Sequence, residues 1–267
     1  MMKILIVGSG NMGKTYARSF LASRFVTETD LFILDKSREQ VEPLTEVSSR
    51  NVFDSPGPFI SDANIVILAV KPQDFPLLAN QIKPFIKSEQ LILSIMAGIQ
   101  ISAIITALGV NRVVRCMPNL PAQIGMGMTV FTSSAGIDKR ELFTVQNLIN
   151  TTGKSIYVED ENMIDAATAI SGSGPAYVYY FMEAMIQAGV SMGFSPSEAE
   201  LLVNQTFMGA VHLHNQNELT CQEWIKKVAS KGGTTEAALK IFDQFAVDDK
   251  IGAGLLAAFE RAKELGS

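Results

Sequence analysis

The chain has 267 residues, which is enough for one large domain or two modest ones. Hydrophobic residues make up 47% of the sequence and charged residues 18%, a composition typical of a packed globular protein and not of a disordered one. The net charge of −5 argues against nucleic acid as a partner, because polyanion binders carry an excess of basic side chains.

Short apolar runs alternate with helical stretches over the first half of the chain. Strands are expected at Lys3–Val7, Leu31–Leu34, Ile65–Val70, Leu91–Ser94 and Val113–Cys116. Between them, stretches such as Met12–Ser23 and Phe75–Ile86 have helical periodicity. Near-continuous apolar strands that alternate with helices predict a parallel, doubly wound α/β sheet covered on both faces. The runs Met128–Phe131 and Ser155–Val158 are expected to extend this sheet at one edge.

The pattern changes at about residue 161, after which no strand-like run occurs. Helices are expected at Ala176–Met192, Pro196–His214, Cys221–Ala229, Glu236–Phe245 and Lys250–Leu265. Helix-start signals precede two of them, Ser195 with Glu198 and Thr220 with Glu223. A small helical domain rich in Ala, Gly, Met and Leu buries its apolar faces best by docking onto a second copy. The sequence therefore predicts an all-helical dimerisation domain at residues 161–267.

The sequence favours a soluble protein of the cytoplasm. Cys116 and Cys221 have neither metal-ligand nor redox-pair spacing, which is typical of free thiols in a reducing compartment. The apolar run Ile4–Val7 is too short for a signal peptide. Residues 91–110 have the length of a membrane span, but Gly98 and polar neighbours interrupt them. We interpret this stretch as a buried strand, a turn and the start of a helix.

A glycine-rich motif follows the first expected strand and opens a helix. Its residues are Gly8, Ser9, Gly10, Asn11, Met12 and Gly13. Glycines at this spacing permit a tight turn, let the backbone approach a pyrophosphate and allow the helix to pack on the strand. With Asp35 about twenty residues further on, the pattern predicts a Rossmann-type dinucleotide-binding domain at residues 1–160. The alternative is a glycine-rich turn in an α/β fold that binds no nucleotide.

The residues after the second strand carry conflicting signals on the choice of cofactor. Asp35 at this position normally binds the ribose hydroxyls and favours NAD. The basic pair Lys36 and Arg38, with Ser37 between them, is suited to the 2′-phosphate of NADP. Such a basic pair is also typical of a solvated helix start. The sequence therefore predicts NADP(H), with NAD(H) as the alternative, and leaves the choice open.

Three further segments end strands at the edge where a dinucleotide-binding sheet holds its ligand. They are Ala69-Val70-Lys71-Pro72, Met96-Ala97-Gly98 and Met117-Pro118-Asn119. Lys71 is placed to meet a phosphate, or is solvated. Small residues and a fixed proline leave room for a nicotinamide ring, whereas ordinary strand-end turns are the alternative interpretation.

Two segments of the helical half are unusual. Ser171–Ala176 contains two glycines and a proline between apolar segments, which predicts a helix break that permits close approach to a cofactor or a second subunit. Ser230–Thr235 places consecutive amides and hydroxyls before the helix that contains Glu236, an arrangement suited to a carboxylate. The alternative for this second segment is N-capping of the helix by Thr234 or Thr235.

No metal or hydrolytic site is expected. His212 and His214 lie in helical sequence without a third ligand nearby, so solvated or capped histidines are favoured over a metal site. The sequence contains no Ser/His/Asp constellation in a supporting context and no Walker-type phosphate loop.

Together, these motifs resemble those of the pyrroline-5-carboxylate reductase family over nearly the whole chain. The resemblance is carried by Gly8–Gly13, Val70-Lys71-Pro72, Ala97-Gly98, Arg115, Met117-Pro118-Asn119, Ser171–Tyr177, Gln205-Thr206, Gly209-Ala210 and Gly232–Thr235. It implies reduction of L-1-pyrroline-5-carboxylate to L-proline with NAD(P)H, the last step of proline biosynthesis. It also implies a homodimer of intertwined helical domains, often assembled further into rings.

The resemblance also implies a substrate site. Its expected residues are Ser230, Gly233, Thr234, Thr235, Glu161 and Lys227. The amides of Thr234 and Thr235, with Ser230, are expected to hold the substrate carboxylate. The hydroxyl of Thr235, the expected catalytic group, is then placed against the ring nitrogen. Glu161 matches an acidic residue that lies near the substrate, and Lys227 falls where the family often has asparagine.

The sequence departs from the family pattern in two places, and two other functions are open to it. Lys231 replaces a common proline, and Asp35-Lys36-Ser37 stands where Asn-Arg-Ser is frequent, which bears on the preference for NADP. A β-hydroxyacid dehydrogenase-like enzyme needs a lysine base, but Lys226 and Lys227 are not in that family's sequence setting. A catalytically silent NAD(P)H-binding regulator is disfavoured by the intact Gly232–Thr235 segment.

Overall fold

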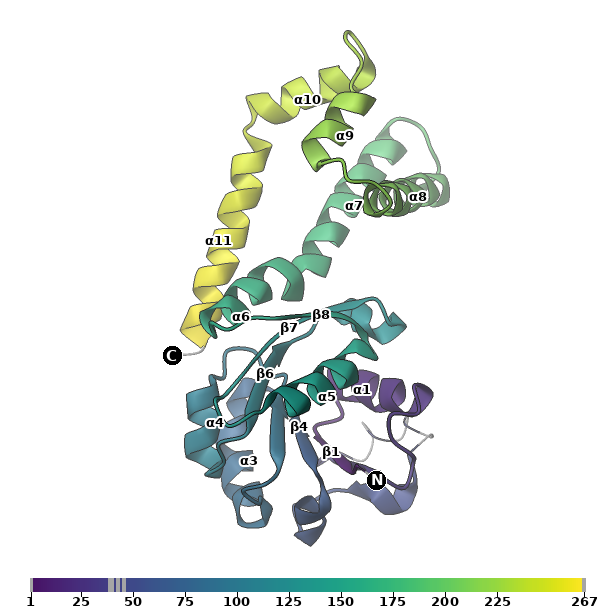
Figure 1. Ribbon diagram of the computed structural model, residues 1–267. Helices are drawn as coiled ribbons and strands as arrows, with labels where there is room; N and C mark the ends of the chain where they lie inside the picture. Colours follow the sequence, from purple (N-terminus) through teal and green to yellow (C-terminus); the bar gives the residue numbers. More distant parts are fainter. Residues whose placement is uncertain (1, 38–40, 42–43, 45–46, 266–267) are drawn as a thin grey trace. The chain divides into compact units, whose positions relative to one another are not determined.

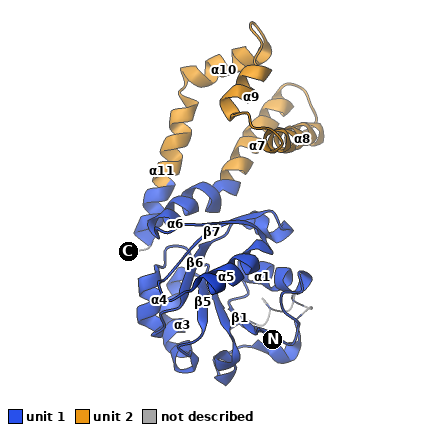
Figure 2. Ribbon diagram, viewed as in Figure 1, with its two compact units in different colours: residues 1–175, 258–267 blue, residues 176–257 orange. Residues whose placement is uncertain are grey.

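The computed structural model describes residues 2–37, 41, 44 and 47–265 (Figure 1). The chain divides into two compact units, which Figure 2 colours separately: residues 1–175 with 258–267, and residues 176–257. Residues 161–175 and the end of the chain therefore pack with the first unit.

The first unit is built on a sheet that has eight strands among the described residues, in the order β3-β2-β1-β4-β5-β6-β7-β8. The strands are β1 (Ile4–Val7), β2 (Leu31–Leu34), β3 (Val52–Phe53), β4 (Ile65–Leu68), β5 (Leu91–Ser94), β6 (Val113–Met117), β7 (Gly127–Ser133) and β8 (Gly153–Tyr157). Neighbouring strands are parallel except β6 and β7, which are antiparallel. Because β7 and β8 cover the two runs expected at the sheet edge, that prediction and the α/β fold class are confirmed. The short strand β3 was not predicted, since two residues show no periodicity.

Helices cover both faces of this sheet (Figure 1). They are α1 (Asn11–Ala22), α3 (Phe75–Ile82), α4 (Ile101–Leu108), α5 (Lys139–Asn150) and α6 (Asn162–Ala167). Side chains alternate along β1, so Ile4 and Ile6 pack with α1 and α5, whereas Leu5 and Val7 pack with α3 and α4. One apolar core therefore lies on each face, as a parallel sheet requires.

The apolar stretch of residues 91–110 folds as β5 and α4 with a turn between them, as the sequence predicts. In the described part of the chain, no helix combines the length and the apolar character needed to cross a membrane. Cys116 is buried in β6 and Cys221 is exposed, and both are free thiols, as expected.

The second unit is helical, as predicted. With the helices that connect it to the first unit, it comprises α7 (Gly174–Ser191), α8 (Pro196–Asn215), α9 (Cys221–Val228), α10 (Thr234–Gln244) and α11 (Val247–Leu265). Both predicted helix starts are capping boxes, formed by Ser195 with Glu198 and by Thr220 with Glu223. In each, the hydroxyl accepts from the glutamate amide while the glutamate carboxylate accepts from the N-cap amide.

The helix break expected at Ser171–Ala176 is confirmed, because Ser173 belongs to neither of the helices on its two sides, whereas the close approach to a cofactor or a second subunit stays a prediction. Residues Thr168–Gly172 form a π-turn, after which α7 begins at Gly174. A Cβ on Gly172 would lie 2.6 Å from Cε of Met117 on β6, so the methionine side chain would have to move to accept it. The glycine-rich composition therefore marks a wide helical turn that packs closely on the sheet of its own chain.

Candidate active site

The glycine-rich motif forms the turn between β1 and α1, and packing requires two of its glycines. Gly8 has a φ of +97°, and a Cβ there would lie 2.8 Å from the carbonyl oxygen of Ala69. A Cβ on Gly13 would overlap the carbonyl oxygen of Gly8. Gly10, the N-cap of α1, differs because a Cβ there would meet no atom within 4 Å. The turn therefore brings β1, α1 and the end of β4 together and leaves open space at Gly10.

A cleft of about 330 Å³ opens beside this turn. It is lined by Gly8 and Gly10, by Asp35 and Lys36 after β2, and by residues 69–71 after β4. These are three of the segments expected to hold a dinucleotide, and the structure brings them together. Strands β1 and β4 are neighbours where the strand order reverses, which is the place where open α/β sheets bind ligands.

Three donors hold the carboxylate of Asp35. The amide and hydroxyl of Ser9 donate to Oδ2 at 2.6 and 2.7 Å, and the amide of Ser37 donates to Oδ1 at 2.9 Å. Asp35 is only 9% exposed, and Ser9 is fully buried. Ser9, predicted to contact the cofactor, thus orients the acidic residue that lines the cleft. Arg38, considered as a phosphate ligand, lies outside the described residues, whereas Lys36 is described and lines the cleft.

The other strand-end segments make structural contacts of their own. Gly98 has a φ of +76°, and a Cβ there would lie 2.7 Å from the carbonyl oxygen of Leu265 at the end of α11. The side chain of Asn119 bonds two backbone groups of its own unit, at 2.8 and 3.0 Å. Neither Met96–Gly98 nor Pro118–Asn119 is among the described residues that line the cleft. Their contact with a nicotinamide ring stays a prediction.

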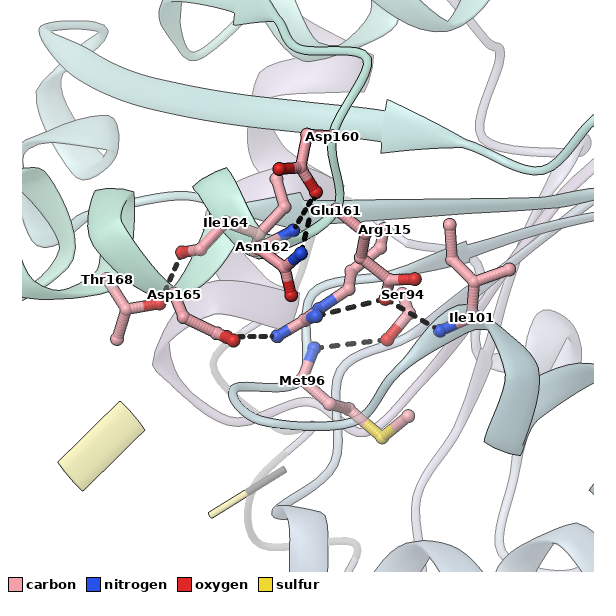
Figure 3. Close-up of polar contacts among 10 residues, drawn as sticks. All are labelled: Ser94, Met96, Ile101, Arg115, Asp160, Glu161, Asn162, Ile164, Asp165 and Thr168. Carbon is pink, nitrogen blue, oxygen red and sulfur yellow. Dashed lines mark hydrogen bonds and ion pairs between the residues drawn. The ribbon is translucent and has the colours of Figure 1, made fainter. Parts of the chain in front are cut away.

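Strand β6 carries a buried arginine that faces α6 (Figure 3). Arg115 is 1% exposed; its Nη1 donates to Oε1 of Glu161 at 3.0 Å and its Nη2 to Oδ1 of Asp165 at 2.7 Å. The same Oε1 accepts the amide of Ile101, the first residue of α4, at 2.8 Å. Glu161, expected near the substrate, thus joins three elements of the first unit. Arg115 is one of the motif residues of the family resemblance, and its charge inside an apolar strand is a visible signal, whereas Asp165 was not predicted.

The Gly-Gly-Thr-Thr segment leads into α10 in the second unit. Gly232 has a φ of +75°, Gly233 is the N-cap, and Thr234 and Thr235 are the first two helical residues. No side chain caps this helix start, so the alternative in which Thr234 or Thr235 is the N-cap is wrong. The amides at such positions have no acceptor within the helix and point out of its end.

A carboxylate of the chain itself lies at this helix start. Glu236 accepts a hydrogen bond from the amide of Gly232 and pairs with Lys240 at 3.2 Å. The bond from the Gly232 amide, and then that from Lys240, lower the pKa of Glu236. A Cβ on Gly233 would lie 2.5 Å from Oγ and 3.0 Å from the carbonyl oxygen of Ser230, so Ser230 packs closely against this residue. Ser230 therefore lies close to the start of α10, where the amide of Gly232 is already bonded to Glu236.

The remaining expected substrate residues lie in both units. Glu161 belongs to the first unit, and Lys227 and Ser230–Thr235 belong to the second. The Nζ of Lys227 is 5.1 Å from the ring centre of Trp224, a cation–π contact within α9. The common contact of these residues with a substrate stays a prediction.

This fold and cleft define a Rossmann-type nucleotide-binding protein with an additional helical unit. A family model described as pyrroline-5-carboxylate reductase dimerisation matches residues 161–265. A second model, described as NADP oxidoreductase coenzyme F420-dependent, matches residues 3–98.

Known proteins resemble the chain over its whole length. A pyrroline-5-carboxylate reductase of Pseudomonas aeruginosa is 35% identical over 264 residues, which cover 98% of this chain and 96% of the relative. A pyrroline-5-carboxylate reductase of Staphylococcus epidermidis is 32% identical over 266 residues, which cover 99% of this chain and 98% of the relative. The crystal structure of Plasmodium falciparum pyrroline carboxylate reductase with NADP bound has a TM-score of 0.90 at 30% identity, covering 100% of this chain and 98% of that one. The chain belongs to the pyrroline-5-carboxylate reductase family.

Proposed function

We propose that this chain reduces L-1-pyrroline-5-carboxylate to L-proline, the last step of proline biosynthesis, with NADP(H) as the cofactor and NAD(H) as the alternative. The observation that carries the proposal is the match of the entire chain to reductases of this name, 35% identical in the relative from Pseudomonas aeruginosa. The cleft at the glycine-rich motif supports it, because such a reductase needs a dinucleotide site at this sheet edge.

The residues of the cleft fit a dinucleotide. Open space at Gly10 and the first amides of α1 suit a diphosphate, which the motif Gly8–Gly13 holds. The adenosine ribose is assigned to residues 35–37, residues 69–71 line the cleft after β4, and Pro72 is a further candidate contact. When bound, the cofactor supplies a hydride from its nicotinamide ring, for which residues 96–98 and 118–119 leave room.

The substrate carboxylate is assigned to the segment Ser230–Thr235. The amides of Thr234 and Thr235 at the uncapped start of α10, with the nearby hydroxyl of Ser230, support an anion site there, whereas Glu236 already accepts the Gly232 amide. The hydroxyl oxygen of Thr235 accepts a hydrogen bond from the protonated ring nitrogen and keeps that proton in place. Glu161 and Lys227 are further candidate contacts. The chain thus acts mainly by placing the imine carbon and excluding water.

We assign residues 1–160 to cofactor binding and residues 161–267 to substrate binding and dimerisation. The helical part carries large apolar side chains that are more than half exposed in the single chain, among them Tyr180, Leu201, Met208 and Phe242. Exposure of this many large apolar side chains is typical of an interaction site, and the description of the matching family model supports a homodimer. A ring of such dimers and a cytoplasmic location complete the proposal.

Oxidation of NADPH and NADH by the purified protein tests the proposed reaction. Oxidation of NAD(P)H with L-1-pyrroline-5-carboxylate, and no reduction of NAD(P)+ with β-hydroxyacids, supports it. A β-hydroxyacid dehydrogenase gives the reverse result, and a silent regulator binds the cofactor but turns over neither substrate. Either result overturns the proposal. The variant Gly13→Ala, which disrupts the turn between β1 and α1, serves as the control for background oxidation.

A further inference from the structure

The buried arginine of β6 has no direct access to a ligand and yet is firmly held. Arg115 is 1% exposed, and its two terminal nitrogens bond two different carboxylates, those of Glu161 and Asp165. Burying these charges is unfavourable unless the geometry satisfies them, so such a network is weak evidence for stability alone. The planar guanidinium, with nitrogens that point in fixed directions, sets the position of whatever its partners hold.

What Glu161 holds is the end of a loop. The turn of residues 95–100 connects β5 to α4. The residue that follows the turn is Ile101, and its amide donates to Oε1 of Glu161 at 2.8 Å. At the other end of the turn, the amide of Met96 donates to Oγ of Ser94, and Ser94 pairs in register with Arg115. Figure 3 shows the turn fastened at both ends beside the same arginine.

The place of this turn in the sheet points to the half of the cofactor that it serves. In a doubly wound sheet, the strands on the two sides of the reversal form two mononucleotide-binding halves. The cleft extends from Asp35 after β2 across the end of β1 to the segment after β4, and β5 and β6 continue the sheet beyond β4. The turn after β5 is therefore placed for the half of the dinucleotide that carries the nicotinamide.

We propose that Arg115 is a positioning residue for the nicotinamide half of the cofactor, acting through Glu161 on the turn of residues 95–100. The inference rests on the proposed use of a nicotinamide cofactor and deepens it. It gives Glu161 a defined task, which is to hold the Ile101 amide, besides the expected contact with the substrate.

Binding of NADPH and of 2′,5′-ADP, measured by calorimetry without substrate, tests the inference. The second ligand is the adenosine half of the first and contains no nicotinamide. Glu161→Ala removes the acceptor of the Ile101 amide but leaves the pair between Arg115 and Asp165, so the variant is expected to fold. We expect it to weaken NADPH binding by about fivefold or more and to leave 2′,5′-ADP binding within about twofold. Glu161→Gln retains an acceptor oxygen and is expected to restore NADPH binding.

Arg115→Met is expected to reproduce the effect of Glu161→Ala, together with a fall in kcat of at least about tenfold. Arg112→Met is the matched control, since Arg112 precedes the same strand and pairs with Glu141 at the opposite end of β6. It is expected to change neither affinity.

The inference is overturned if Glu161→Ala binds both ligands as the wild type does, or weakens both equally. It is also overturned if the wild type binds NADPH no more tightly than 2′,5′-ADP. Failure of the proposed reaction gives a different result, namely absence of turnover in a wild type whose NADPH binding still exceeds that of 2′,5′-ADP.

Discussion

Replacing Asp35 by asparagine tests how the cleft selects its cofactor. Oδ2 of Asp35 accepts two bonds from Ser9, and Oδ1 accepts one from the amide of Ser37. Asparagine retains one carbonyl oxygen that accepts from Ser9. Its NH₂ group then faces the Ser37 amide, and because both groups are donors, they form no hydrogen bond. The substitution removes a negative charge and one of the three bonds, at a cost of about 1.5–3 kcal/mol in stability.

The lost charge acts mainly on a ligand that carries a 2′-phosphate. Two unit charges about 5 Å apart repel each other by roughly 3 kcal/mol at an effective dielectric constant of 20. Asp35 is 9% exposed, so water screens its charge weakly, while Lys36 on the same cleft wall offsets part of the repulsion. We therefore expect Asp35→Asn to raise the NADPH/NADH specificity ratio by about tenfold to a hundredfold.

The assay is kcat/KM for both cofactors at fixed L-1-pyrroline-5-carboxylate, with both dissociation constants measured by nicotinamide fluorescence. Asp74→Asn is the control, because it removes a carboxylate from the same cleft on the segment after β4. It is expected to change the ratio by less than about threefold. If the NADPH/NADH specificity ratio of Asp35→Asn equals that of the wild type, this carboxylate does not face the ribose.

Other parts of the chain give equally definite expectations. Gly13→Ala forces a Cβ onto the carbonyl of Gly8 and is expected to lower both Tm and NADPH affinity, whereas Gly10→Ala enters open space and is expected to lower affinity alone. The bond from the Gly232 amide lowers the pKa of Glu236, so this bond is present above pH 4.5, the ordinary pKa of a glutamate, and is lost as the pH falls through the lowered pKa. The NMR resonance of the Gly232 amide is expected to shift over that pH range. A resonance that does not titrate contradicts the expectation. Leu201→Asp charges an exposed apolar residue of α8 and is expected to convert a dimer into a monomer in sedimentation, so an undiminished dimer contradicts the assigned interface.

The parts of the fold that sequence predicts are those fixed by local periodicity. The run Ile4–Val7 reads as a buried strand because all four residues are apolar, and the structure buries all four. The capping box of Ser195 and Glu198 spans one helical turn, so its signal is complete within a few residues. The glycine-rich motif is equally local, and its turn forms beside the predicted cleft.

The contacts that sequence does not predict join distant residues. Arg115 and Asp165 are 50 positions apart, and Ser9 and Asp35 are 26 apart, so no local pattern relates them. At Ser171–Ala176 the composition predicts the break at Ser173, but it does not predict the π-helical turn before the break or the packing of Gly172 on Met117. In each case the residue type was conspicuous, but its partner was defined only by the packing of the sheet and helices.

The role of Thr235 is the expectation on which the proposed chemistry depends most. Because Gly233 is the N-cap of α10 and no side chain caps the helix, removal of the Thr235 hydroxyl breaks no capping bond. Alanine also has the higher helix propensity, so Thr235→Ala is expected to leave Tm unchanged or slightly raised. If the hydroxyl oxygen accepts a hydrogen bond from the protonated ring nitrogen, its loss removes a hydrogen bond to a charged group. Such a bond is worth about 1.5–3 kcal/mol, or roughly 10- to 150-fold in kcat/KM.

Steady-state kinetics with L-1-pyrroline-5-carboxylate measures this effect, and NADPH affinity is expected to stay near that of the wild type. Thr235→Ser retains a hydroxyl and is expected to keep most of the activity. Thr234→Ala is the matched control, since it changes the neighbouring residue of the same helical turn and leaves the backbone amides in place. A kcat/KM in Thr235→Ala within about twofold of the wild type would remove the hydroxyl from the mechanism. The carboxylate site would then consist of the backbone amides alone, and the ring nitrogen would take its proton from solvent before binding.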